Sequence, residues 1–209
     1  MTIGNLIALR QTNIVRLMAY SGVAQTGFMI APLAVAGHSV AAGDQALSAT
    51  VTYLMIYAAM NLGAFAVIIT LARRTGSAEI SSYSGSFHYA PGLTLAMTVF
   101  LFSLAGIPPL GGWFAKFEVF RVLATAGEPW GYALAVVAAV NSVIALFYYA
   151  AIARRMWADE APDDDLSPVP VTPSLVSALA LCGIVTLVFG VAPQAVARFT
   201  DVSLLALGG

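Results

Sequence analysis

The chain has 209 residues, of which 60% are hydrophobic and 9% are charged, and its formal net charge is −1. An ordinary soluble domain carries about 25% charged residues. The composition therefore excludes that class and predicts an all-α polytopic membrane protein, with residues 1–209 as one transmembrane domain. The net charge argues against nucleic acid as a partner. The single cysteine, Cys182, allows neither a disulfide framework nor a Cys/His metal cluster.

The N-terminal stretch, Met1 to Leu9, is apolar but too short to cross a membrane. We interpret it as a stub, the tail of a helix whose beginning is absent. The next apolar run, Leu17 to Ala36, has the length of one span. Ser21 and Gln25 lie one turn apart on the same face of it, and Pro32 is expected to kink its end.

A polar loop is expected from Gly37 to Ser48, before a second span from Ala49 to Ala72. Tyr53, Tyr57 and Asn61 recur every four residues along this span and form a polar stripe on an apolar helix. In lipid, such a stripe should face other helices. Two interpretations stay open: hydrogen bonding between helices, and a part in transport.

The stretch from Pro91 to Gly127 contains the only lysine of the chain, Lys116. As one straight helix, its roughly 35 helical residues would extend about 50 Å, well beyond a hydrocarbon core of about 30 Å. The sequence instead predicts two helical runs, Gly92 to Ala105 and Phe114 to Ala126, separated by a break. The break consists of Gly106, Pro108, Pro109, Gly111 and Gly112.

The two prolines of the break lack N–H groups, so the carbonyls of Leu104 and Ala105 lose their helical donors. In hydrocarbon, such freed groups persist only where protein or a water-filled cavity surrounds them. The ammonium of Lys116 is also costly at that depth, and by default it marks an ion or proton pathway. The alternative is a lysine that extends to the membrane surface from a helix end.

The next span is expected from Trp130 to Ile152, with Asn141 and Tyr148 seven residues apart on one face. Residues 158–173 form an acidic, proline-rich segment that cannot bury enough apolar area to order itself, which predicts a solvated loop. A last span is expected from Leu175 to about Val191. The chain therefore has five predicted spans after the stub.

Arginine pairs occupy alternate connections, at Arg10/Arg16, Arg73/Arg74 and Arg154/Arg155, and the connections between them contain no lysine or arginine. The positive-inside rule predicts that these three connections are cytoplasmic, or on the matrix side in an organelle, and that the C-terminus lies outside. We expect an integral protein of a bacterial plasma membrane.

Six motifs resemble one family in order and spacing, and the resemblance weakens after about Trp157. They are Gly4-Asn5-Leu6, Ala8 to Asn13, Arg16 to Ser21, Asn61 to Phe65, Ser103 to Pro109 with Ala115-Lys116-Phe117, and Asn141 to Ile144 with Tyr148-Tyr149. The family is subunit N of proton-pumping NADH:quinone oxidoreductase (complex I), which is related to membrane subunits of multisubunit cation/proton antiporters.

The resemblance implies a fold of fourteen helices with two inverted five-helix repeats, of which this chain would supply most of the second repeat and the closing helix. It also implies that Lys116 passes protons. NAD, FMN, iron–sulfur clusters and quinone would belong to partner subunits, and this chain would contact other membrane subunits, the bilayer and, through the complex, the quinone pool. No dinucleotide fingerprint or cysteine cluster occurs in the chain, so we expect no redox centre or bound cofactor in it.

The sequence departs from the family at several points. Val15 stands where relatives commonly carry lysine, Gln25 where subunit N usually has histidine, and Glu118 where an aromatic residue is common. Glu118 is expected to pair with Arg121 rather than Lys116, because residues three apart share a helix face. The first repeat is absent, and we interpret the chain as a fragment rather than as half of a split subunit.

The resulting hypothesis is a proton-translocating subunit that couples electron transfer from NADH to quinone to proton transport, an enzyme only as one part of a larger translocase. Lys116 is the proposed proton carrier. The candidate proton path contains Glu118, Asn141, Tyr148, Tyr57, Ser103 and Gln25. The alternatives are a cation/proton antiporter subunit, a membrane subunit of an energy-converting hydrogenase, and a nonfunctional remnant.

Overall fold

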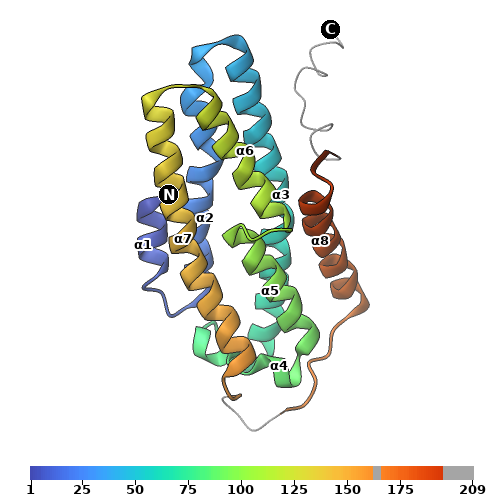
Figure 1. The fold of residues 1–209 in the computed structure, drawn as a ribbon. Helices are drawn as coiled ribbons and strands as arrows, with labels where there is room; N and C mark the ends of the chain where they lie inside the picture. The colour runs from blue at the N-terminus through green and yellow to red at the C-terminus, as the bar shows by residue number, and fades with distance from the viewer. Residues whose placement is uncertain (162–165, 195–209) are drawn as a thin grey trace.

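A computed structural model describes residues 1–161 and 166–194, which form a bundle of helices joined by short connections (Figure 1). The α-helices are α1 Thr2–Ala8, α2 Ile14–Ile30, α3 Val40–Thr75, α4 Ser86–Tyr89, α5 Pro91–Ala105, α6 Gly111–Thr125, α7 Pro129–Ala158 and α8 Pro173–Val191. Two 3₁₀ helices, η1 Ala31–His38 and η2 Ile80–Tyr83, lie between them. The predicted all-α fold is confirmed.

Helix α2 starts where Asn13 caps it, because the Asn13 side chain accepts hydrogen bonds from the backbone N–H groups of Val15 and Arg16, both over 3.1 Å. At Ala31 the helix tightens into η1, whose first turn contains Pro32. Proline removes the donor that an α-helix needs at this point. The irregularity expected at Pro32 is therefore present.

The loop predicted from Gly37 to Ser48 is wrong, because α3 begins at Val40. Ser39 caps α3 by accepting a hydrogen bond from the backbone N–H of Ala42 over 3.1 Å. Four alanines in the first ten residues favour the helix, and two of them, Ala46 and Ala49, are buried in the core. Capping, propensity and packing together outweigh the polar composition that suggested a loop.

The arginines expected in three connections lie in or beside helix ends, and these helix ends meet at one end of the bundle. The backbone N–H of Ile14 donates to Ala78 over 2.8 Å, and that of Ile80 donates to Thr12 over 2.7 Å. The N–H of Gly85 donates to Arg155 over 3.0 Å. In Figure 1 the connection after α1, the end of α3 and the end of α7 all lie toward the bottom. The alternation of charged and uncharged connections therefore corresponds to the two ends of the bundle.

Within the part of the chain that the structure describes, four helical segments are long and apolar enough to cross a membrane. They are Ile14–His38, Val40–Thr75, Pro129–Ala158 and Pro173–Val191. A fifth crossing requires α5 and α6 together, and Figure 1 shows α6 continuing the direction of α5 with the break between them. The predicted discontinuous helix is thus present, although α6 begins at Gly111 rather than at Phe114.

The segment between α7 and α8 is only partly described. Val169 and Val171 are half-buried and pack against the core, whereas Leu166 and Pro168 are exposed. Asp163, Asp164 and Asp165 of the acidic run, and the C-terminus with Arg198, lie outside the described residues. Helix α7 extends six residues beyond the predicted Ile152, to Ala158, and buries Met156 in the core.

Candidate functional site

Helix α5 ends at Gly106, whose backbone φ is +94°. This left-handed conformation favours glycine and lets the N–H groups of the end turn reach back. The N–H of Gly106 donates to Phe102 and Ser103 over 3.0 and 2.9 Å, and the N–H of Ile107 donates to Phe102 over 3.0 Å. The end of α5 is therefore a defined helix terminus rather than a frayed one.

The first turn of α6 lies directly against the last turn of α5. A Cβ atom on Gly112 would stand only 1.8 Å from the carbonyl oxygen of Ser103. The Gly112 N–H donates to Ser103 Oγ over 3.0 Å, and that hydroxyl in turn contacts the sulfur of Met60 at 3.3 Å. Ser103, predicted on the proton path, therefore fastens the two halves of the break together.

The carbonyls freed by the two prolines are both occupied by side chains. Gln25 Nε2 donates to the oxygen of Leu104 over 3.0 Å. Lys116 Nζ donates to the oxygen of Ala105 over 2.7 Å. Backbone acceptors that the sequence leaves without helical donors are thus satisfied by one residue from α2 and one from α6.

Lys116 itself is buried, with 5% of its surface exposed. Its Nζ lies 4.8 Å from the centroid of the Phe28 ring, within range of a cation–π contact. Within residues 1–161 and 166–194, no carboxylate oxygen comes within 4.0 Å of this nitrogen. A carbonyl dipole and an aromatic face therefore stabilise the ammonium in place of a counter-ion.

Gln25 connects the break to three further side chains. Its Oε1 accepts a hydrogen bond from the hydroxyl of Tyr53 over 2.5 Å, and its Nε2 lies 3.4 Å from the hydroxyl of Tyr149. The Tyr149 hydroxyl also pairs with Ser21 Oγ. Because α2, α3 and α7 all contribute, this buried polar network links the helices around the break.

A second buried polar group lies between α1 and α7. The Tyr148 hydroxyl donates to Asn5 Oδ1 over 2.9 Å, and Asn5 Nδ2 donates to Asn141 Oδ1 over 2.9 Å. The rings of Tyr148 and Tyr149 lie edge to face with centroids 4.5 Å apart. The predicted pair Asn141 and Tyr148 therefore shares one partner and adjoins the Gln25 network.

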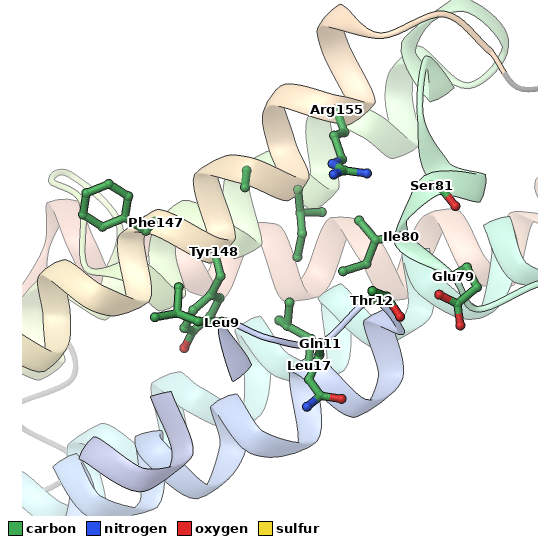
Figure 2. Close-up of a pocket in the computed structure, with 12 residues that line it drawn as sticks. Leu9, Gln11, Thr12, Leu17, Glu79, Ile80, Ser81, Phe147, Tyr148 and Arg155 are labelled. Atoms are coloured by element: carbon green, nitrogen blue, oxygen red, sulfur yellow. The ribbon is translucent and has the colours of Figure 1, made fainter. Parts of the chain in front are cut away.

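A cavity of about 440 Å³ lies between Tyr148 and the arginine-containing end of the bundle. Figure 2 shows Arg155 and Glu79 at one side of the lining and Tyr148 and Phe147 at the other. The lining mixes charged, amide and apolar groups, including Gln11. Water at that end can therefore approach the tyrosine that contacts Asn5.

Two predicted site residues take no part in the hydrogen bonds of these networks. Glu118 Oε2 pairs with Arg121 Nη2 at 2.6 Å, which confirms the expected pairing along α6, and this pair does not reach Lys116. Tyr57 is half-buried, and its hydroxyl packs toward Gly22, where an added Cβ would lie 3.1 Å away. The structure thus separates Glu118 from the buried contacts around the break, whereas Tyr57 lies beside Tyr53 and Tyr148.

Four residues of the networks were not among the predicted site residues: Asn5, Ser21, Tyr53 and Tyr149. Each is a polar side chain on an otherwise apolar helix, and Ser21 and Tyr53 belong to polar stripes visible in the sequence. That signal marks them as facing other helices but does not identify their partners.

Helix α8 covers the break from outside. A Cβ atom on Gly190 would stand 1.8 Å from the carbonyl oxygen of Pro109, and one on Gly111 would stand 2.9 Å from that of Thr186. The backbone of α8 therefore touches the backbone of the break at Gly190 and at Gly111, where a side chain would not fit. No group of three His, Cys, Asp or Glu side chains in the described part of the chain is arranged to hold a metal ion.

A family model described as "NADH:quinone oxidoreductase/Mrp antiporter, TM" matches residues 1–142. The chain is 41% identical over 192 residues to NADH-quinone oxidoreductase subunit N 2 of Sorangium cellulosum, covering 91% of this chain and 36% of that protein. It is 41% identical over 209 residues to NADH-quinone oxidoreductase subunit N 1 of Koribacter versatilis, covering 99% and 39%. The chain thus spans less than half the length of these relatives.

Solved structures show the same fold. A chain of respiratory complex I from Thermus thermophilus with bound Aureothin superposes with a TM-score of 0.75 at 30% identity, covering 94% of this chain and 42% of that one. A chain of the Mrp complex from Dietzia sp. DQ12-45-1b superposes with a TM-score of 0.82 at 21% identity, covering 99% and 45%. The second likeness concerns the fold alone.

Proposed function

Because this chain belongs to the NADH:quinone oxidoreductase/Mrp antiporter transmembrane family, we propose that it acts within a proton-translocating membrane subunit of a bacterial respiratory NADH:quinone oxidoreductase. The observation that carries this proposal is the Lys116 ammonium, buried and bound to the carbonyl of Ala105 at a helix break. Inverted-repeat transporters place their ion sites at such breaks. The 41% sequence identity to two proteins named NADH-quinone oxidoreductase subunit N supports this complex over an antiporter.

The contacts of Lys116 depend on its charge. A charge-assisted hydrogen bond to the Ala105 oxygen and a cation–π contact with Phe28 both weaken when the amine loses its proton. Proton release would therefore loosen the side chain from the break, and proton uptake would return it. This coupling between charge and position is what a proton carrier requires.

The cavity and the buried networks form the proposed approach to the break. Protons from the arginine-containing end would pass the cavity to Tyr148 and Asn141 and continue through Gln25 toward Lys116. Ser103 and Tyr57 would contribute hydroxyl groups beside this route. We propose that the arginine-containing end is cytoplasmic, following the positive-inside rule.

The exit would lead toward the other end of α6. Glu118 lies two residues beyond Lys116 and pairs with Arg121. NAD, FMN, iron–sulfur clusters and quinone would be bound by partner subunits, so the redox steps lie outside this chain. Its own residues would bind, orient and transfer the proton.

The test is Lys116→Ala in the complete complex, with Arg121→Gln as a control of equal charge change on the same helix. We expect pumping per NADH oxidised to fall, because a positioned proton-transfer group contributes roughly 10²–10⁴-fold to the step in which it acts. Inverted membrane vesicles with a pH-sensitive dye report pumping, and absorbance at the NADH band reports oxidation. Wild-type pumping per NADH in Lys116→Ala would remove Lys116 from the path.

A second candidate function is a cation/proton antiporter subunit, which the superposition on the Mrp complex chain favours at the level of fold. Transport assays in vesicles that carry an imposed ion gradient, without NADH, distinguish the two candidate functions. An antiporter exchanges sodium for protons under an imposed gradient, whereas the proposed subunit pumps only while NADH is oxidised.

A further inference from the structure

The cavity beside Tyr148 is charged at one side only. Apart from the Tyr148 phenol, the titratable groups among its described lining residues are the carboxyl of Glu79 and the guanidinium of Arg155. Both of these residues are exposed, whereas Tyr148 is buried. Figure 2 shows Glu79 and Arg155 at one side of the lining and Tyr148 at the other. The cavity therefore leads from a charged, accessible side to a buried tyrosine.

Backbone contacts fix the position of Glu79 at this side. Asn13 and Glu79 form an isolated antiparallel bridge, and the N–H of Ile80 donates to the Thr12 oxygen over 2.7 Å. The N–H of Glu79 donates to Ser77 Oγ over 3.1 Å. Two connections of the chain, before α2 and after α3, are thus joined where the carboxylate lies, and no ion pair is needed to hold it there.

The two charges at this side are not neutralised by other side chains. Within residues 1–161 and 166–194, no basic side chain comes within 4.0 Å of the Glu79 carboxylate, and no carboxylate comes within that distance of the Arg155 guanidinium. Arg10 and Arg16 lie in and after the connection that pairs with Glu79, but neither lines the cavity. An unpaired carboxylate and an unpaired guanidinium therefore border the same cavity.

These two groups act differently on protons and on metal cations. A carboxylate attracts cations, and charged clefts raise the rate of ion capture by about 10–10³-fold; it also accepts and returns a proton. A guanidinium keeps its positive charge and repels a hydrated sodium ion, which must move as an ion. A proton can instead transfer through water, and the cavity of about 440 Å³ has room for several water molecules, each of which occupies about 30 Å³ in the liquid.

We propose that Glu79 and Arg155 form a proton-selective entrance to this cavity. The Glu79 carboxylate binds a proton from solution, passes it as the carboxylic acid to a water molecule in the cavity, and returns to the carboxylate. Arg155 keeps sodium and potassium away from the same route. The inference rests on the proposed proton path to Lys116, and it adds the residues that load the path and select its ion.

The first experiment measures NADH oxidation by the complete complex in detergent with a soluble quinone, so that no gradient forms. In Glu79→Gln we expect the rate at alkaline pH to fall about tenfold, the lower end of the range by which an opposite charge speeds ion capture, and to recover at acid pH, where protons are abundant. Formate, a small carboxylic acid, should restore the rate at constant pH. Glu160→Gln, the same change at an exposed residue of that end outside the lining, should match the wild type.

The second experiment tests the selection of the ion. NADH oxidation by Arg155→Gln is compared in sodium chloride and in choline chloride of equal ionic strength at alkaline pH. We expect a loss of activity in sodium, because sodium then competes with protons at Glu79. Arg154→Gln, the neighbouring exposed arginine outside the lining, should show no such loss. Equal rates of Arg155→Gln in the two salts would overturn the proposal.

Lys116→Ala separates this inference from the proposed function. If Lys116→Ala pumps as the wild type does, the proposed function fails and the entrance fails with it. If Lys116→Ala is impaired while Glu79→Gln oxidises NADH at the wild-type rate at every pH, only the entrance is overturned. A rate of Glu79→Gln that is low at every pH and does not respond to formate would show a structural role for Glu79 and would also overturn the entrance.

Discussion

Gln25 and Lys116 donate to neighbouring carbonyl oxygens, those of Leu104 and Ala105, from two different helices. The pairing assigns a neutral amide to one oxygen and a titratable amine to the next. Only the second contact changes with protonation. If Lys116 carries protons as proposed, the break can keep its structure through Gln25 while the contact of Lys116 changes.

Gln25→Leu should destabilise the chain, because it leaves the Leu104 oxygen and the Tyr53 hydroxyl buried without this partner. Each unsatisfied group costs about 1–3 kcal/mol. Thermal unfolding of the complete complex in lipid nanodiscs measures the effect. Thr26→Val, a substitution at the exposed neighbouring position, serves as the control and should change stability little.

Gly112→Ala should prevent the two halves of the broken helix from meeting. Its Cβ would stand 1.8 Å from the Ser103 oxygen, which is backbone and cannot rotate away. We expect a loss beyond the roughly 1–3 kcal/mol of ordinary overpacking. Gly183→Ala on α8 has no atom within 4 Å of its new Cβ, so it should stabilise by up to about 1 kcal/mol through helix propensity. Expression and thermal unfolding separate the two variants.

Glu118→Gln tests the proposed exit. The Glu118–Arg121 pair is partly exposed, and such a pair contributes about 0.2–1 kcal/mol to folding. Stability should therefore change little in both Glu118→Gln and Arg121→Gln. If protons leave through Glu118, pumping per NADH falls in the first variant and not in the second. Equal pumping in both would exclude this carboxylate from the exit.

Tyr83 should make stability depend on pH in the alkaline range. It lies in the connection between α3 and α5, where burial, with a smaller effect of Tyr89, raises the pKa of Tyr83 from 10.0 to about 12. The unfolded state loses the proton first, so stability is full below about pH 10 and falls as pH rises toward 12. Each tenfold difference in proton affinity between the folded and unfolded chain corresponds to about 1.4 kcal/mol of stability. Tyr83→Phe should show a flatter pH profile in thermal unfolding.

The contacts that the sequence predicted correctly are local ones. Glu118 and Arg121 are three residues apart, and the prolines act on carbonyls four residues away, so helical geometry alone sufficed. The partners of Gln25 could not be predicted, because Leu104 and Tyr149 lie on other helices and helix packing chooses among several buried polar groups. The polar stripes indicated which helix faces are buried, but they did not indicate which helix packs against each face.

The start predicted for the second span, Ala49, was wrong for a different reason, since α3 begins at Val40. The residues from Val40 to Ser48 include Gly43 and Asp44, which are typical of loops. The cap at Ser39 and the burial of Ala46 stabilise the helix here. Burial depends on the folded bundle and cannot be deduced from this segment alone. The same holds for the extra turns of α7, which continue to Ala158 and bury Met156 in the core.

The backbone contact between Gly190 and Pro109 predicts that α8 limits ion leakage at the break. A non-helical stretch of chain with a nearby ammonium can raise the ion permeability of a membrane, because exposed backbone dipoles attract ions and water. With α8 packed against it, the break is covered by protein on that side, and Gln25 and Lys116 occupy its freed carbonyls on the other. A chain lacking α8 should consequently leak current rather than merely lose stability.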